Sequence, residues 1–387
     1  MNTTKKSKLI IKSLKPDKSD KDKADKSNNF NNSNIFNNIN RINNIGNFSK
    51  YFTIFSLIIS LFTCMISLTG CSDKKSSVSD TGFYFDTAVT ITLYNANETT
   101  LKECFKICDK YEKLFSNTIE SSDISKINAN SKSEKYTTVS NETIELIKAG
   151  IHYGDISNGK FDITIGYLSE LWNFSGDSPK VPDNTSIENI ITHIDYNNIS
   201  INGNEVLLTD SEAKLDLGGI AKGYIADKLK EYLKKQNISK GIINLGGNIL
   251  LIGSKPDNSN YNIGLQKPFG SDDDVIAIVN ANDLSIVTSG IYERYFYEND
   301  KLYHHILNTS TGYPEENNLL AVTIISKSST DGDGLSTSAY LLGLEDGMNL
   351  IESIDGVEAV FIDKDYKLHL SSGLKLKDNV LTLKSKE

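Results

Sequence analysis

The sequence predicts an α+β fold, with mainly antiparallel sheets and packed helices in a single domain. Strand-like and helix-like segments are interspersed along the chain, without the strict strand–helix alternation that builds a doubly wound parallel sheet. No repeat of fixed period is present, and no long linker follows residue 80. With 387 residues, 38% of them hydrophobic, the chain can bury one large core or two modest ones.

The N-terminal residues 1–50 differ in composition from the rest of the chain. They are rich in Lys, Asn, Ser and Asp and poor in apolar side chains, so burial cannot offset the entropy lost on ordering. We therefore predict a disordered polar and basic segment. The whole chain carries a net charge of −9, which excludes a general basic surface for nucleic acid.

Residues 51–71 have the layout of an export signal, in which lysines precede an apolar run that ends in small residues. The ending Leu68-Thr69-Gly70-Cys71 resembles a bacterial lipobox, in which the cysteine becomes the lipidated first residue of the mature protein. The alternative is one membrane-spanning helix, because about 18 apolar residues are just long enough. Both interpretations place the chain from residue 80 onward outside the cytoplasmic membrane, with residues 72–81 as a flexible tether.

Local patterns predict the elements of the remaining chain in order. Residues 83–95 alternate and are rich in β-branched side chains, which predicts a strand. Apolar residues at helical spacing predict helices at 98–115 and 141–157, with Ser122 as the cap of a short helix between them. By the same criteria we expect helices near 187–192 and 333–343, and strands at 193–209 (a hairpin around Asn202-Gly203), 241–253 (two strands meeting at Gly246-Gly247), 260–266, 274–280, 284–289, 302–307, 319–326, 357–362 and 366–370.

The segment 213–235 combines a short predicted strand, two glycines and a helix. Residues 213–217 are typical of a strand, Gly218 and Gly219 follow, and apolar residues then recur at helical spacing. A helix start presents unpaired N–H groups and a positive dipole end, and glycine lets a ligand approach the backbone. Lys222 lies in the first turn, where a cation opposes the dipole. A bound anion would explain this lysine; the alternative is a solvated lysine on a surface helix.

Asp333 and Thr337 lie four residues apart at the predicted helix start, so their oxygens face one side. A carboxylate, a hydroxyl and a backbone carbonyl together suit Mg²⁺. The alternative is an ordinary acidic N-cap at Asp331 or Asp333, with Thr337 incidental.

His304 and His305 are adjacent on a predicted strand, so only one of them can enter a site. A histidine with a near-neutral pKa can act as a general base, although a strand histidine can equally be structural. The neighbouring residues 288–296 offer hydroxyls and the pair Glu293-Arg294, which can also be a surface ion pair. Cys104 and Cys108 fall on a helical stripe and are expected in the core, with a disulfide as the alternative.

Six short motifs follow one another along the chain. They are Phe161-Asp162-Ile163-Thr164, Asp216-Leu217-Gly218-Gly219-Ile220-Ala221-Lys222-Gly223, Asn244-Leu245-Gly246-Gly247-Asn248, Ser289-Gly290 with Tyr292-Glu293-Arg294-Tyr295-Phe296, His304-His305-Ile306-Leu307-Asn308 with Gly312-Tyr313-Pro314, and Asp333-Gly334-Leu335-Ser336-Thr337. In this order the motifs resemble the ApbE family of FAD:protein FMN transferases. The resemblance covers about residues 82–370, and it implies one catalytic domain of this family over 82–387. Members of this family are exported, often as lipoproteins, which agrees with Cys71.

The resemblance implies a reaction in which Mg²⁺ assists cleavage of the FAD pyrophosphate. FMN is attached through a phosphoester to a Ser or Thr hydroxyl of an acceptor protein, expected to be a membrane redox subunit, and AMP leaves. Asp333, Thr337 and the carbonyl of Gly219 are the implied metal ligands. His305 is the implied base or cofactor-positioning group, with Lys222 as a second catalytic residue. The implied FAD contacts are Phe85, Asp86, Thr87, Phe161, Asp162, Ile163, Thr164, Asp216, Lys222 and Ile306.

The sequence departs from the family pattern at two positions. Asn308-Thr309 replaces the usual Asp-Pro, which removes a negative charge near the expected base, and Ile291 replaces a polar residue. Trp172 is expected either to flank the isoalloxazine ring or to lie in the core. Two alternatives to transfer stay open: an FAD pyrophosphatase, and a flavin-binding lipoprotein without chemistry. A solute-binding lipoprotein is more distant, because the metal pair would have no role in it.

Overall fold

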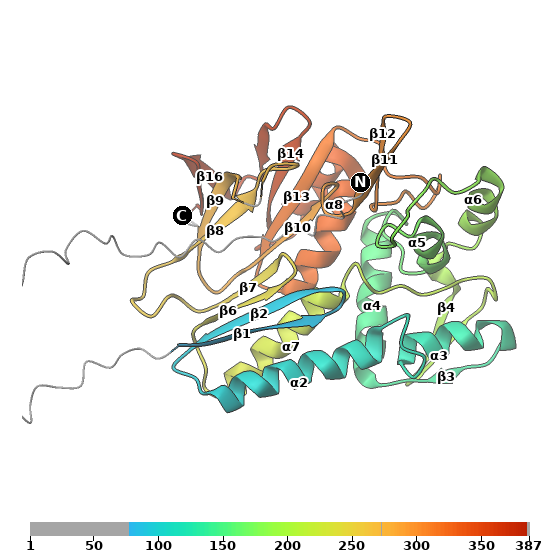
Figure 1. Ribbon diagram of the computed structural model, residues 1–387, viewed down its shortest axis with the longest axis horizontal. Coiled ribbons are helices and arrows are strands. Elements are labelled where there is room, and N and C mark those ends of the chain that lie inside the picture. The colour runs from blue at the N-terminus through green and yellow to red at the C-terminus, as the bar shows by residue number, and fades with distance from the viewer. Residues whose placement is uncertain (1–76, 272, 385–387) are drawn as a thin grey trace, which may run out of the picture. The chain divides into compact units, whose positions relative to one another are not determined.

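The computed structural model describes residues 77–271 and 273–384 (Figure 1). The predicted disordered segment 1–50 and the export signal with Cys71 lie outside the described residues. Within the described part of the chain, no helix is long and apolar enough to cross a membrane.

The centre of the domain is an eight-stranded sheet in which every neighbouring pair is antiparallel. This confirms the predicted α+β class with mainly antiparallel sheets. In spatial order the strands are β1 (Ser77–Tyr84), β2 (Thr87–Tyr94), β6 (Gly241–Leu245), β7 (Asn248–Ile252), β10 (Ser285–Gly290), β13 (Leu319–Ser326), β14 (Glu358–Asp363) and β15 (Leu368–Leu370).

Both faces of the central sheet are covered, because alternate residues of β7 enter two different cores. Leu250 and Ile252 pack with the helices, whereas Ile249 and Leu251 pack with a second, four-stranded sheet. Helices α2 (Glu98–Phe115), α4 (Asn141–Ile156), α7 (Ala221–Lys235) and α8 (Ser329–Glu352) contribute to the first core (Figure 1). The second sheet has the order β16 (Leu374–Lys377), β17 (Val380–Leu383), β9 (Val275–Ala281) and β8 (Tyr261–Gln266).

Smaller elements complete the described chain. They are α3 (Asp123–Asn130), η1 (Ser131–Ser133), α5 (Gly166–Trp172), α6 (Asn184–Ile191), η2 (Tyr196–Asn198), the sheet of β3 (Thr137–Thr138), β5 (Glu205–Leu208) and β4 (Ile199–Asn202), and the hairpin of β11 (Tyr295–Glu298) and β12 (Lys301–His304). The hairpin of β11 and β12 carries His304 at its end.

The predicted strand at 83–95 is wrong, because this segment turns back on itself. Phe85 and Asp86 have φ angles of 54° and 57°, and these positive values close a two-residue turn between β1 and β2. The strand β1 begins at Ser77, so residues 77–81 belong to the sheet and not to the predicted tether. The expected strand at 213–217 also does not form; only Lys214 makes a single bridge, to Ile165.

Helix α8 begins earlier than the sequence predicts. Its N-cap is Ser328, whose hydroxyl accepts a hydrogen bond from the Asp331 N–H at 3.1 Å. The alternative of an N-cap at Asp331 or Asp333 is therefore wrong. The helix also continues past Gly343, where a φ of 82° produces a kink.

The cysteine pair is confirmed as part of the core. Cys104 and Cys108 are both fully buried and carry free thiols. Burial raises the pKa of each thiol to about 12, so neither is a reactive thiolate at neutral pH.

Candidate active site

The motif at 216–227 meets the motif at 333–337 where helices α7 and α8 touch. The backbone N–H of Gly223 donates to Oδ2 of Asp333 at 2.6 Å. A Cβ atom at Gly223 would lie 2.1 Å from the Ser329 carbonyl oxygen, so only glycine permits this approach. This hydrogen bond thus joins two residues that lie 110 positions apart in the sequence.

This bond satisfies an N–H group in the first turn of α7. The helix begins at Ala221, so the Gly223 N–H is one of the first N–H groups, which have no partner within the helix. The Gly219 carbonyl lies just before the helix and accepts no hydrogen bond from any described residue. Gly218 and Gly219 are exposed, and Lys222 is half-buried in the first turn. The turn therefore offers a free carbonyl oxygen and a lysine to a ligand.

Asp333 is held in place from two sides. It is only 4% exposed, and its Oδ1 accepts a hydrogen bond from Nδ2 of Asn248 at 3.0 Å. Burial raises the pKa of Asp333, while the nearby Lys222 ammonium lowers it. Thr337, one turn further along α8, shares a hydrogen bond with the Ser289 hydroxyl at 3.0 Å.

These oxygens fit a hard cation such as Mg²⁺. The donor set would consist of one buried carboxylate, the Thr337 hydroxyl and the free Gly219 carbonyl, with water completing the shell. Among the described residues there is no group of three or more His, Cys, Asp or Glu side chains around a common point. This arrangement therefore differs from a transition-metal site of that kind. It suits Mg²⁺, which often uses only one or two carboxylates.

The predicted flavin segment 161–164 packs directly on this turn. The Phe161 ring lies 3.1 Å from the position of a Cβ at Gly219, and the Asp216 N–H donates to the Ile163 carbonyl at 2.8 Å. Asp216 in turn accepts the Gly218 N–H at 2.8 Å, which fixes the glycine turn.

The side chain of Asp162 is fully used inside the protein. Its two oxygens accept hydrogen bonds from the N–H and hydroxyl of Thr164 and from the N–H of Tyr196, at 2.6–2.8 Å. Burial raises its pKa. Asp162, Ile163 and Thr164 are all buried, so the side chains of these residues shape the segment. Their contact with FAD stays a prediction.

The predicted segment 85–87 forms the turn between β1 and β2. The Phe85 N–H donates to Oε1 of Glu112 at 2.8 Å, which holds a bulky residue at positive φ. Thr87 packs so closely on Gly246 that a Cβ there would lie 2.1 Å from the threonine hydroxyl. Since Asn248 follows Gly246 by two residues, this turn and the amide that holds Asp333 lie at the same end of the sheet.

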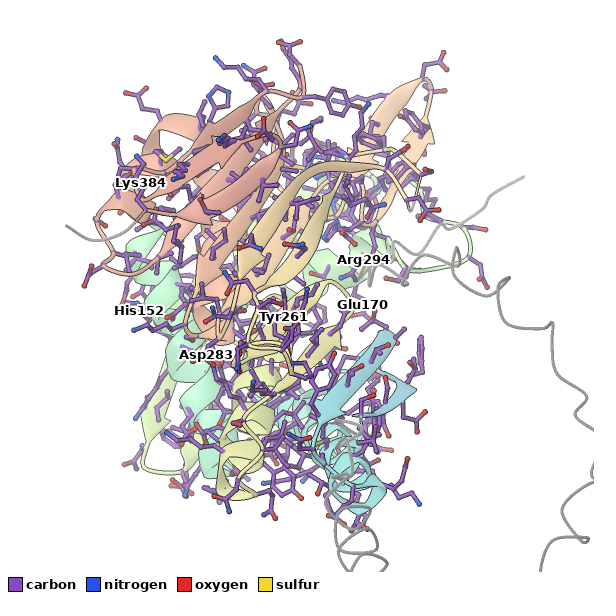
Figure 2. All side chains as sticks on the ribbon, turned by 90° about the vertical axis from the view of Figure 1, so that its left-hand side faces the viewer. His152, Glu170, Tyr261, Asp283, Arg294 and Lys384 are labelled. Carbon is purple, nitrogen blue, oxygen red and sulfur yellow. The ribbon has the colours of Figure 1, made fainter. Side chains whose placement is uncertain are left out.

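The two histidines differ in their surroundings, but His305 lies after the end of β12, so the predicted strand at 302–307 is too long. His304 is buried against Tyr340, and burial lowers its pKa to about 4. The Nδ1 atom of His305 lies 3.2 Å from the carbonyl of Arg294, which immediately precedes β11 and is labelled in Figure 2. A carbonyl only accepts hydrogen bonds, so Nδ1 carries the proton and Nε2 is left as a base.

The charges around His305 keep it neutral. Burial lowers its pKa well below the usual range, and Arg294, His304 and Lys222 lower it further. The Lys222 charge lowers the pKa of both His305 and Asp333.

The loop after His305 is tied to the rest of the domain by hydrogen bonds. The Ile306 carbonyl accepts the Glu315 N–H at 2.9 Å, and Ile306 itself is buried. Trp172 is fully buried and donates its indole N–H to the Gly312 carbonyl at 2.8 Å. The core interpretation of Trp172 is therefore confirmed.

Asn308, where the sequence departs from the family pattern, has a clear partner. Its Nδ2 donates to Oε2 of Glu315 at 2.6 Å, and its Oδ1 accepts the N–H groups of Ser310 and Thr311. The negative charge that Asn308 lacks is thus supplied by Glu315, whose side chain is 12% exposed and lies 3.6 Å from the Lys160 ammonium.

Comparison with known proteins decides the family. The family model described as "ApbE family" matches residues 85–361. The chain belongs to the ApbE family. A Klebsiella pneumoniae protein named "FAD:protein FMN transferase" is 34% identical over 291 residues, covering 75% of this chain and 90% of that protein. A Treponema pallidum protein of the same name is 30% identical and covers 71% of this chain and 80% of its own length.

Solved structures of this family have the same fold. The flavin transferase ApbE of Vibrio cholerae superposes with a TM-score of 0.69 at 28% identity, covering 77% of this chain and 97% of that chain. The ApbE protein of Thermotoga maritima gives a TM-score of 0.70 at 31% identity, with the same coverage. The ApbE resemblance drawn from the six motifs is therefore confirmed.

Several residues of the site were missed by sequence reasoning. Asn248 and Glu112 hold Asp333 and Phe85, and Glu315 holds Asn308. Only Asn248 had a sequence signal, since it ends the motif that begins at Asn244.

Proposed function

We propose that this protein is an FAD:protein FMN transferase that uses Mg²⁺ to move FMN onto a Ser or Thr hydroxyl of an acceptor protein, with release of AMP. The names of the curated relatives support the transferase activity. The single observation that supports the metal is the Gly223–Asp333 hydrogen bond. It brings the buried carboxylate to the glycine turn, where the Gly219 carbonyl accepts no hydrogen bond from the described residues.

The chain's own groups suit each part of such a transfer. The exposed turn at Gly218-Gly219 and the Lys222 ammonium would bind the FAD pyrophosphate, as helix starts bind anions. Mg²⁺ at Gly219, Asp333 and Thr337 would supply charge neutralisation for the phosphate oxygens.

His305 would act on the acceptor. Its Nε2 would take the proton of the acceptor hydroxyl, while the acceptor oxygen forms a bond to the FMN phosphorus and the bond from that phosphorus to the AMP oxygen breaks. The Nδ1–H bond to the Arg294 carbonyl orients the ring for this role. Because the pKa of His305 is lowered, the imidazole would be neutral and ready to accept a proton at pH 7.

The proposed location of this activity rests on the sequence alone. The lipobox ending at Cys71 supports a lipid-anchored enzyme on the extracytoplasmic face of the cell membrane. The acceptor would then be an extracytoplasmic domain of a membrane redox subunit. Replacing Cys71 with alanine should release the protein from the membrane fraction; unchanged membrane attachment would contradict lipid anchoring.

The activity is tested with the full chain, FAD, MgCl₂ and an acceptor protein that carries a candidate Ser or Thr. Mass spectrometry should find one FMN added to the acceptor and an equal amount of AMP in solution. AMP release without a modified acceptor would instead favour an FAD pyrophosphatase. The absence of both products would exclude both enzymatic functions.

The Asp333→Asn variant should lose this activity. The matched control is Asp365→Asn, which removes the same charge in an exposed turn between β14 and β15. The control variant should keep the activity of the wild type.

A further inference from the structure

Asp227 is the last residue of the motif at 216–227, and the functions derived above leave it without a role. We propose that Asp227 is a positioning residue for the metal site, which acts by fixing helix α8 on helix α7. This inference rests on the proposed Mg²⁺ site at Gly219, Asp333 and Thr337.

The carboxylate of Asp227 binds the start of α8 through four hydrogen bonds. Oδ1 accepts the Ser329 N–H at 2.8 Å. Oδ2 accepts the Thr330 N–H at 2.9 Å, the Thr330 hydroxyl at 2.7 Å and the Ser328 hydroxyl at 3.1 Å. One side chain of α7 therefore holds three consecutive residues of the neighbouring helix.

A carboxylate suits this position better than an amide. The first N–H groups of a helix have no partner within the helix and form the positive end of its dipole. Ser328 caps only the Asp331 N–H, and Asp227 provides acceptors for the two N–H groups before it. An amide would place an NH₂ group against one of these donors.

The contacts between α7 and α8 follow a regular register. Asp227 bonds to Ser329, and four residues earlier on α7 Gly223 bonds to Asp333, four residues later on α8. One further step of four reaches Gly219, which lies just before α7, and Thr337 on α8. Asp333 therefore lies in the second pair of this series, and the other two implied metal ligands lie one step beyond it.

This series explains how a residue outside the metal shell can affect metal binding. Residues four apart lie on one helix face, so a shift of α8 at Asp227 is carried along the face to Asp333 and Thr337. Little adjustment is possible between the helices, because the Gly223 backbone already lies against the Ser329 carbonyl. Loss of the Asp227 contacts would change the spacing between the Gly219 carbonyl and the α8 ligands.

Mg²⁺ is more sensitive to such a change than Ca²⁺. It demands near-octahedral geometry at about 2.0–2.1 Å, whereas Ca²⁺ accepts about 2.3–2.6 Å and irregular coordination. A positioning role for Asp227 therefore predicts that its loss weakens Mg²⁺ more than Ca²⁺. A residue that only stabilises the fold would lower the amount of folded protein and leave the ratio of the two affinities unchanged.

The experiment is a calorimetric titration of MgCl₂, and separately of CaCl₂, into the full chain saturated with FAD. Asp227→Asn should raise the Mg²⁺ dissociation constant about tenfold or more, as loss of groups that orient metal ligands does elsewhere. The Ca²⁺ constant should rise less than about threefold, and FAD binding without metal should stay within about twofold of the wild type. Thr330→Ala removes one of the four hydrogen bonds and should raise the Mg²⁺ dissociation constant by a smaller factor. This variant replaces Asp227→Asn in the titration if Asp227→Asn does not fold.

The matched control is Asp283→Asn. Asp283 also binds α7, through Lys230 at 2.8 Å, and its side chain accepts the Gly253 N–H instead of bonding to the start of α8. This variant should keep both metal constants of the wild type. Unchanged Mg²⁺ binding in Asp227→Asn, or an equal loss of Mg²⁺ and Ca²⁺, would overturn the inference, as would a wild type that binds no Mg²⁺. Failure of the proposed transfer is a separate result, seen as an unmodified acceptor while wild-type metal binding is intact.

Discussion

Replacing Asn308 with aspartate should destabilise the protein, although this substitution restores the residue usual in the family. The Oδ1 contacts of Asn308 with Ser310 and Thr311 can survive, because aspartate also accepts hydrogen bonds. The Nδ2 contact with Glu315 cannot, because two carboxylates would then face each other at a spacing of 2.6 Å. Lys160 lies 3.6 Å away and only partly compensates for the added charge.

The size of the effect has a lower and an upper bound. Losing a hydrogen bond to a charged group costs about 1.5–3 kcal/mol. The loss of stability in N308D cannot exceed the cost of protonating one of the two carboxyl groups. The protonated carboxyl would again donate a hydrogen bond to the other one. From an ordinary pKa of about 4, protonation at pH 7 costs about 4 kcal/mol. We therefore expect N308D to lower the free energy of unfolding by about 2–4 kcal/mol at pH 7.

The pH dependence gives the sign that tests this reasoning. The carboxyl pair in N308D would have one pKa raised above its unfolded value. Stability from such a group is present below the unfolded pKa and is lost as pH rises through the folded pKa. The deficit should therefore be largest at pH 7 and should shrink toward pH 4, measured by urea unfolding at both pH values with the wild type beside it.

Two further variants complete the test. Adding Glu315→Gln to N308D should recover most of the loss, because the new amide can donate to the carboxylate. Asn95→Asp is the matched control, since Asn95 is exposed and its φ of 55° is one that aspartate also adopts. An N308D variant as stable as the wild type at pH 7, or a deficit that does not change with pH, would refute the reasoning.

Three other outcomes are expected. Gly223→Ala should lower the free energy of unfolding by about 1–3 kcal/mol in urea, because its methyl group would meet the Ser329 carbonyl at 2.1 Å. The FMN transfer rate should stay constant from pH 8 down to about pH 6.5, because the lowered pKa keeps His305 neutral there. A fall near pH 7 would contradict this assignment. Glu112→Ala should raise the KM for FAD through loss of the Phe85 contact, whereas Glu112→Gln should not, since its amide oxygen still accepts that N–H.

The sequence predicted those elements whose cause is local. Strands such as Leu319–Ser326 and Ser285–Gly290 are runs of β-branched and apolar residues, and their positions follow from that composition. The turn at Phe85-Asp86 was missed because a bulky residue such as Phe85 rarely adopts positive φ, and Asp86 alone is a weak turn signal. It depends on Glu112, 27 residues away, and on the packing of Thr87 against Gly246. Residues 213–217 have a strand-like pattern but find no neighbouring strand beyond one bridge.

The residues of the candidate site also fall into two groups, those with a local sequence pattern and those without one. The motifs were found because each is a short pattern, but the residues that hold them in place act over long separations. Asn248 reaches Asp333 across 85 residues, and Asp227 reaches Ser329 across 102 residues. A single sequence contains no signal for such pairs, because nothing in the spacing of either partner depends on the other.

The start of α8 shows how a small error in a predicted boundary changes the chemistry of a residue. At a helix start near residue 333, the Asp333 carboxylate would cap its own helix and be occupied by local N–H groups. The true start at Ser329 assigns the capping to Ser328 and Asp227, and it places Asp333 one turn inside the helix, facing α7. Its carboxylate then accepts the N–H of Gly223, in the first turn after the Gly219 carbonyl. The metal site proposed for this protein therefore depends on the capping of α8 by two other residues.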